Sequence, residues 1–159
     1  MNDREFFLKT RAAEKAGFVK VLRALPADRL DYRPHERSPH ARQIAWIIAA
    51  ELLAACEAAE KGETSWKTVP PPPLEDMIAL FEKQDAELAR LVGAMDDAAW
   101  EKKVKLSFGG KVVMEPPCRD FLWMLLFDAI HHRGQLTAYI RPMGGKVPGV
   151  YGPSGDDKP

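Results

Sequence analysis

The sequence predicts an all-α fold, a four-helix bundle with one longer connection between its third and fourth helices. Three observations predict it. Four segments of about 20 residues carry apolar side chains at helical spacing, prolines and glycines separate these segments, and strands do not alternate with helices. The chain of 159 residues has the length of one domain, predicted to cover 1–159 with an irregular tail from about 142 to 159.

The first two helices are predicted from their apolar spacing and their ends. The first covers residues 3–25, because its apolar side chains recur every three or four positions and Pro26 cannot continue the helix. The second is expected to start with Ser38 as its N-cap and Pro39 at its first helical position, and to end near Gly62.

The third and fourth helices are predicted in the same way. The third runs from residue 74, after four consecutive prolines, to about residue 95, and the fourth starts after Pro116 and Pro117 and ends at Arg141. Between them, the alternating apolar side chains of "VKLSF" and the following Gly-Gly pair predict a small hairpin or an extended crossover.

The composition excludes several classes of function. Lysine and arginine together number 23, as do aspartate and glutamate, so no net charge attracts the chain to nucleic acid or to an anionic membrane, and neither is expected as a partner. The charged start of the chain does not resemble a signal peptide, and two cysteines outside any CxxC pair do not form a disulfide framework. We therefore expect a cytoplasmic protein.

The fourth helix carries ionisable residues within its predicted apolar face. At about 100° per residue, Asp128 and His132 share one face with Leu125 and Leu136, so both are expected to point into the bundle, while Arg133 is expected to point away from it. Such a pair either satisfies itself by a hydrogen bond within the helix or provides two ligands, at i and i+4, to a metal ion.

Glu51 lies in the apolar stripe of the second helix and is the candidate for a third ligand. The alternative is a charge that hydrogen-bonds His132 or forms an ion pair with Arg11, which lies with Glu14 near the inner stripe of the first helix. Spacing alone leaves these two interpretations open.

Three segments resemble the DinB/YfiT-like superfamily, whose members are metal-binding four-helix bundles. "RPHERSPHARQIAWIIAAE" (33–51) is similar to the second-helix motif of that family, and "DAIHHRGQL" (128–136) is similar to its fourth-helix signature. "YIRPMGGKVPGVYGPSGDD" (139–157) resembles a tail found in one subgroup of bacterial members.

The resemblance implies one divalent metal ion, zinc or nickel, with Asp128 and His132 as ligands. The third family ligand, a histidine on the second helix, corresponds to Ile47, which has no donor atom, and Glu51 follows one turn later on the same face. Within this site, His131 and Gln135 are expected to support a ligand or to contact substrate. The resemblance also implies a transferase or isomerase that uses a low-molecular-weight thiol together with a small-molecule substrate.

A homodimer is also predicted, because members of the family are commonly dimers and the fourth helix has apolar residues outside its predicted inner stripe. These residues are Leu122, Trp123, Leu126 and Ile130. Two hypotheses of function follow. The protein is a metal-dependent thiol transferase, or it is a metal-free bundle in which Ile47 fills the ligand position and which acts as a small-ligand-binding or interaction module. The sequence does not decide whether it is an enzyme.

Overall fold

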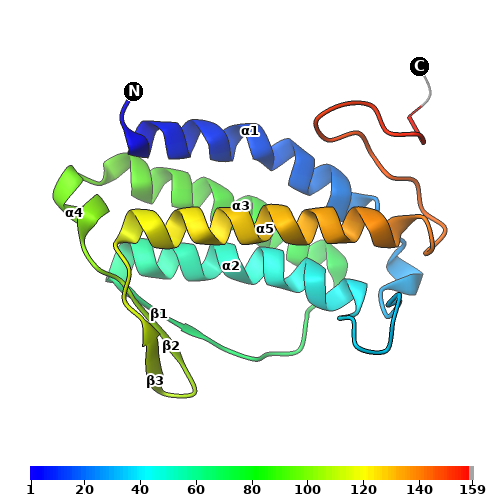
Figure 1. Cartoon of the computed structure of the whole chain (residues 1–159), viewed down its shortest axis with the longest axis horizontal. Helices are drawn as coiled ribbons and strands as arrows, with labels where there is room; N and C mark the ends of the chain where they lie inside the picture. The colour runs from blue at the N-terminus through cyan, green and yellow to red at the C-terminus, as the bar shows by residue number, and fades with distance from the viewer. Residues whose placement is uncertain (158–159) are drawn as a thin grey trace.

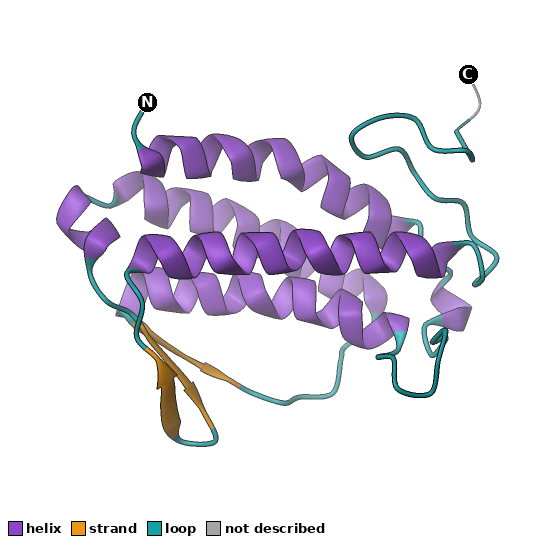
Figure 2. Ribbon diagram, in the orientation of Figure 1, coloured by secondary structure: helices purple, strands orange, loops and turns teal. Residues whose placement is uncertain are grey.

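Four long helices and a small three-stranded sheet make up the fold (Figures 1 and 2). The computed structural model describes residues 1–157, so the last two residues of the predicted domain and tail, 158 and 159, lie outside the described residues. The elements are α1 (Asp3–Arg23), η1 (Ala27–Arg29), α2 (Ala41–Lys61), β1 (Glu63–Trp66), α3 (Leu74–Ala94), α4 (Asp97–Glu101), β2 (Lys105–Phe108), β3 (Lys111–Met114) and α5 (Cys118–Ile140).

The long helices α1, α2, α3 and α5 pack as a closed ring of neighbours. Both α1 and α2 pack against α3 and against α5. The colours of Figure 1 show that α2 and α3 run in the same direction, because the connection 62–73 returns along the bundle before α3 begins. The predicted bundle therefore has two long connections, 62–73 and 95–117, where the sequence predicted one.

The chain is mostly helical, but it is not all-α as predicted. The predicted hairpin is present as β2 and β3, which pair antiparallel on either side of Gly109 and Gly110. The sequence prediction missed β1, which pairs in parallel with β2, and the short helix α4. A parallel partner separated from β2 by about 40 residues has no local signal, because the first connection must cross the bundle before the pairing forms.

Local residues determine most helix ends. The Asn2 side chain accepts a hydrogen bond from the Glu5 backbone N–H at 2.8 Å and the Glu5 carboxylate accepts one from Asn2 N–H at 3.0 Å, which starts α1 at the predicted residue. Helix α2 begins later than predicted, with His40 as its N-cap. Its first free N–H groups, of Ala41 and Arg42, donate to backbone carbonyls of the preceding loop, so Ser38 is not needed as a cap.

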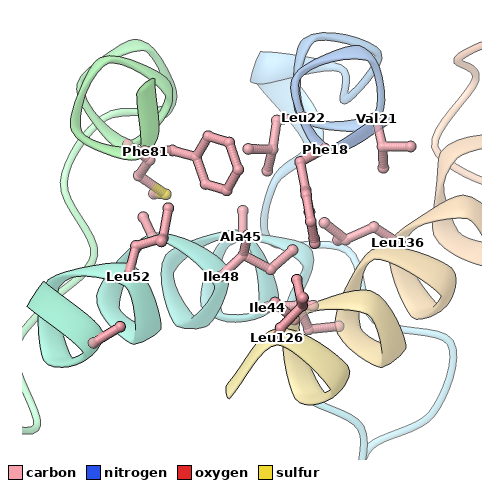
Figure 3. Close-up of a cluster of buried hydrophobic side chains, with 14 of the residues drawn as sticks. Phe18, Val21, Leu22, Ile44, Ala45, Ile48, Leu52, Phe81, Leu126 and Leu136 are labelled. Atoms are coloured by element: carbon pink, nitrogen blue, oxygen red, sulfur yellow. The ribbon is translucent and has the colours of Figure 1, made fainter. Parts of the chain in front are cut away.

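The hydrophobic core lies inside the ring of four helices (Figure 3). Phe18 of α1 and Phe81 of α3 meet with ring centroids 5.3 Å apart, and Ile48 of α2 and Leu136 of α5 are buried with them. This packing fixes α1, α2 and α5 relative to one another, and these helices carry the ionisable residues of the candidate site.

The tail after α5 is irregular, as predicted, yet it is held by specific contacts. The Asp156 carboxylate accepts from Val147 N–H at 2.8 Å and from the Arg141 guanidinium at 2.9 Å. The Tyr151 hydroxyl bonds to the Glu14 carboxylate of α1 and accepts from Arg133 of α5. The tail is therefore anchored to the middle of α1 and to the C-terminal part of α5.

Within residues 1–157, no helix is both long enough and apolar enough to span a bilayer.

Candidate metal centre

Glu51, Asp128 and His132 come together where α2 faces α5. One carboxylate oxygen of each acid and one imidazole nitrogen of His132 all lie within 4.8 Å of one another. The His132 Nε2 atom is 3.5 Å from the nearer Asp128 carboxylate oxygen, as expected for residues four apart on a helix. The structure thus groups the three residues that the sequence proposed as ligands.

The three side chains differ in their access to solvent. Glu51 is buried, with 3% of its surface exposed, while the side chain of His132 is 16% exposed and that of Asp128 is 51% exposed. The prediction that Asp128 points into the bundle is therefore wrong. It lies at the rim, and the site is closed on the Glu51 side and open beside Asp128.

The face of α5 that is buried is rotated from the predicted one. Arg133, expected to point away from the core, is 3% exposed, whereas Leu125 is only half-buried. The Arg133 guanidinium is buried because Glu14 pairs with it at 2.6 Å and the Phe18 ring lies 4.6 Å from its central carbon. The prediction from apolar spacing treated every arginine as exposed, so it assigned the wrong buried face to the helix.

Burial dominates the electrostatics of Glu51. The pKa of Glu51 is raised to about 10, and loss of solvent is the largest cause. A hydrogen bond to Asp128 and the negative charge of Asp128 add to the rise, and the positive charge of Arg11 opposes it. With this pKa, Glu51 keeps its proton at neutral pH when no cation is bound. Two carboxyl groups so close favour a bound proton or a bound cation over two free charges.

Gln135 lies one turn after His132 and holds its ring. The His132 Nδ1 and the Gln135 side-chain oxygen are 2.8 Å apart. An Nδ1–H that donates to this oxygen leaves the Nε2 lone pair free on the side of Asp128, which is the tautomer that a metal ligand requires. This is the position expected of a residue that supports a ligand.

His131 has a different environment. It is exposed, with its ring centroid 5.4 Å from that of His132, and it is not one of the three grouped side chains. Together with Asp128 it lines a shallow depression on the outer face of α5, whose other lining residues are Asp120, Trp123, Met124, Leu125 and Phe127. His131 is therefore placed to contact a molecule outside the bundle.

Arg11 does not form the ion pair with Glu51 that the sequence offered as an alternative, because it pairs with Asp85 instead. Arg11 donates to the Asp85 carboxylate of α3 at 2.8 Å, and Lys15 contacts the other Asp85 oxygen at 3.0 Å. The sequence prediction did not include Asp85, although its place between Phe81 and Leu88 in the apolar stripe of α3 is a signal of a buried charge.

Comparisons with known proteins identify the family and the fold. The sequence model of the DinB family matches residues 1–158. A DinB-like protein from Bacillus cereus has a TM-score of 0.74 at 23% identity, covering 92% of this chain and 97% of its own. A DinB-like protein from Bacillus subtilis has a TM-score of 0.65 at 14% identity, covering 87% of this chain and 92% of its own.

The fold is also similar to that of an enzyme. A mycothiol-dependent maleylpyruvate isomerase has a TM-score of 0.60 at 17% identity, with 88% of this chain and 65% of the enzyme covered. No protein with a curated description is detectably similar in sequence. At these identities, the likeness to solved structures shows a shared fold.

Proposed function

The chain belongs to the DinB family, and we propose that it is a divalent-metal-dependent transferase that joins a small thiol to a small electrophile. The observation that carries the proposal is the convergence of Glu51, Asp128 and His132, with ligand atoms within 4.8 Å of one another. Three protein ligands leave coordination positions open, which is typical of catalytic rather than structural metal sites.

The donor set fits a divalent transition metal. Two carboxylate oxygens and one imidazole nitrogen are ligands that zinc and nickel accept. The Glu51 carboxyl is 3% exposed, and burial of a carboxylate is costly unless a cation or hydrogen bonds compensate its charge. Glu51 supplies the donor that Ile47, at the family's histidine position, does not.

Each residue has a separate task in this proposal. Glu51 closes the inner side of the site, Asp128 forms its solvent-facing rim, and Gln135 keeps the His132 Nε2 directed at the site. A divalent metal ion held there supplies a Lewis acid that lowers the pKa of a thiol and makes it nucleophilic at neutral pH. His131 contacts the substrate from the rim.

The outer face of α5 supports binding of an apolar electrophile. Trp123, Met124 and Phe127 line the depression beside Asp128, and no lysine or arginine of the described residues lines it. The thiol cosubstrate is supported by the shared fold of the mycothiol-dependent isomerase.

The alternative is a metal-free module that binds a small ligand or a partner. Ile47 favours it, because an apolar side chain at the family's ligand position needs no metal to satisfy it. The two functions differ in their response to metal ions, since only a metal-binding protein gains stability from zinc or nickel.

The test compares two aspartates of α5. In the parent, zinc or nickel should raise the melting temperature, and Asp128→Asn should abolish this rise. Asp120→Asn is the control, because it makes the same chemical change about two turns earlier in the helix. Asp120 pairs with Arg119 at the surface. An equal rise in Asp128→Asn would show that the metal binds elsewhere, and no rise in the parent would favour the metal-free module.

Activity is tested on the parent, on Asp128→Asn and on Asp76→Asn, which changes an exposed aspartate of α3 outside the depression. Consumption of mycothiol with a chromogenic aromatic halide should need added metal in the parent, persist in Asp76→Asn and disappear in Asp128→Asn. Consumption that is equal in all three proteins, or that survives a chelator, would contradict a metal-dependent transfer.

A further inference from the structure

Two buried polar atoms from different helices lack a partner, and the residues that carry them line the same small void. The two atoms are Nε of Arg11 on α1 and Oε2 of Glu51 on α2. Arg11 is 6% exposed and Glu51 is 3% exposed, so solvent at the surface does not satisfy either atom. One atom is a donor and the other an acceptor, and each leaves a hydrogen bond unmade that would be costly to lose.

The void between them has about the size of one water molecule. Its volume is about 10 Å³, and its remaining lining is apolar, with side chains from all four long helices such as Phe7, Ile48, Leu88 and Leu122. A void of this size holds a water molecule only where polar groups can bind it. Arg11 Nε–H and Glu51 Oε2 provide one donor and one acceptor.

The Arg11 guanidinium is fixed on its other side. Its terminal nitrogen donates to Asp85 at 2.8 Å, and Lys15 holds the second Asp85 oxygen at 3.0 Å. Arg11 and Glu51 are not in direct contact, since no hydrogen bond or ion pair joins them in residues 1–157, but their charges influence one another. A polar path thus runs from Lys15 at the surface through Asp85 to Arg11, and the void separates Arg11 from Glu51.

We propose that Arg11, anchored by Asp85 and Lys15, is a positioning residue that holds the Glu51 carboxylate in its metal-binding orientation through one buried water. The water accepts from Arg11 Nε–H and donates to Glu51 Oε2, which leaves the other Glu51 oxygen for the metal. This inference rests on the proposed function. It assigns the buried charges of α1 and α3 a role at the site between α2 and α5.

The arrangement has a physical purpose, because a carboxylate ligand without a partner for its second oxygen can rotate or bind a proton instead of the metal. Carboxylates that bind metal ions are usually hydrogen-bonded through their second oxygen, and loss of such a contact lowers metal affinity about 10- to 100-fold. The Asp85 pair also prevents the long Arg11 side chain from turning toward solvent.

The test measures metal affinity and coordination together. Arg11→Gln should weaken zinc binding, measured by titration calorimetry, about 10- to 100-fold and change the visible absorption spectrum of the cobalt-loaded protein. Glu14→Gln is the matched control, because it breaks the other buried ion pair of α1, with Arg133, without lining the void. Its affinity and cobalt spectrum should equal those of the parent.

A second variant covers the case in which Arg11→Gln does not fold, since a lone Asp85 would then be buried without its partner. The double variant Arg11→Met/Asp85→Leu removes both charges and keeps the core filled, and it should show the same loss of affinity. A folded variant of either kind with parental affinity and spectrum would overturn this inference alone. A parent that binds no metal would overturn it together with the proposed function.

Discussion

Replacing Ile47 with histidine should restore the ligand that the family places on the second helix. Ile47 lies one helical turn before Glu51 on the same face of α2, a rise of about 6 Å. Unlike its neighbours Ile44 and Ile48, which are fully buried, Ile47 is only half-buried, so the substitution opens no cavity in the core. The histidine should therefore fold into place beside Asp128 and His132.

The size of the effect follows from burial and from mass action. Loss of a half-buried isoleucine should cost about 1 kcal/mol in chelator, and this lowers the melting temperature by about 2–4 °C for a domain of this size. Metal at about 100 times its dissociation constant adds about 2.7 kcal/mol, so Ile47→His should melt about 5–11 °C above its own chelator value. After the loss of about 1 kcal/mol is included, this is about 3–7 °C above the parent in chelator.

The assay is a melting curve in chelator and in zinc or nickel, followed by titration calorimetry. Leu53→His is the control, because it adds a histidine to an exposed position of α2 on a different face from Glu51. If Ile47→His binds metal no more tightly than the parent, or no more tightly than Leu53→His, position 47 does not reach the site and the family's ligand position does not apply here.

Three further predictions concern protons, thiols and assembly. In chelator, the free energy of unfolding of the parent should fall relative to that of Glu51→Gln as the pH rises from about 5 to about 9, by at most about 1.4 kcal/mol per pH unit. The reason is that folded Glu51, with its pKa of about 10, keeps a proton that the unfolded chain releases near pH 4.5. Parallel stability curves of the two proteins would contradict this prediction. Burial raises the pKa of Cys56 to about 12 and of Cys118 to about 11, so a thiol reagent at pH 8 should label neither until the protein unfolds, and rapid labelling of the native protein would refute it. Light scattering at tens of micromolar protein should give twice the chain mass of 17.8 kDa for the parent and the mass of one chain for Phe127→Glu. The substitution places a charge on the predicted interface, because Phe127 is 61% exposed on the outer face of α5. A monomeric parent would refute the dimer.

The predicted dimer face needs a correction from the structure. Leu122 and Leu126, expected outside the core, are 1% and 2% exposed and belong to it. The exposed apolar side chains of α5 are instead Met124 and Phe127, and Phe6 of α1 extends them through its contact with Trp123. The proposed interface remains on α5 but on a face rotated from the predicted one. It includes Met124 and Phe127 of the depression beside Asp128, so in the predicted dimer the electrophile would bind between the two copies.

The fold was predictable where short-range chemistry decides it. Asn2 with Glu5 starts α1, four prolines precede α3 at Leu74, and two prolines precede α5 at Cys118, so these starts were read from neighbouring residues. Strand β1 was missed because its only strand partner is β2, which the chain reaches after crossing the bundle. Such pairing is decided by tertiary contacts rather than by the four residues themselves.

The candidate site was predictable for a similar reason, and its surroundings were not. Asp128 and His132 share a face by spacing alone, and Glu51 stands out as a charge in an apolar stripe, so their meeting was expected. Arg133 was placed on the wrong side because its burial depends on Glu14, 119 residues earlier in the chain. Apolar periodicity cannot show which charge has found a distant partner.

The central claim is that Glu51, Asp128 and His132 bind one divalent metal ion. Untagged protein, soaked in zinc or nickel and then dialysed, should contain about one equivalent of metal per chain by elemental analysis, and Glu51→Gln and Asp128→Asn should each contain much less. Less than about a tenth of an equivalent in the parent, or equal metal in the parent and both variants, would contradict the account.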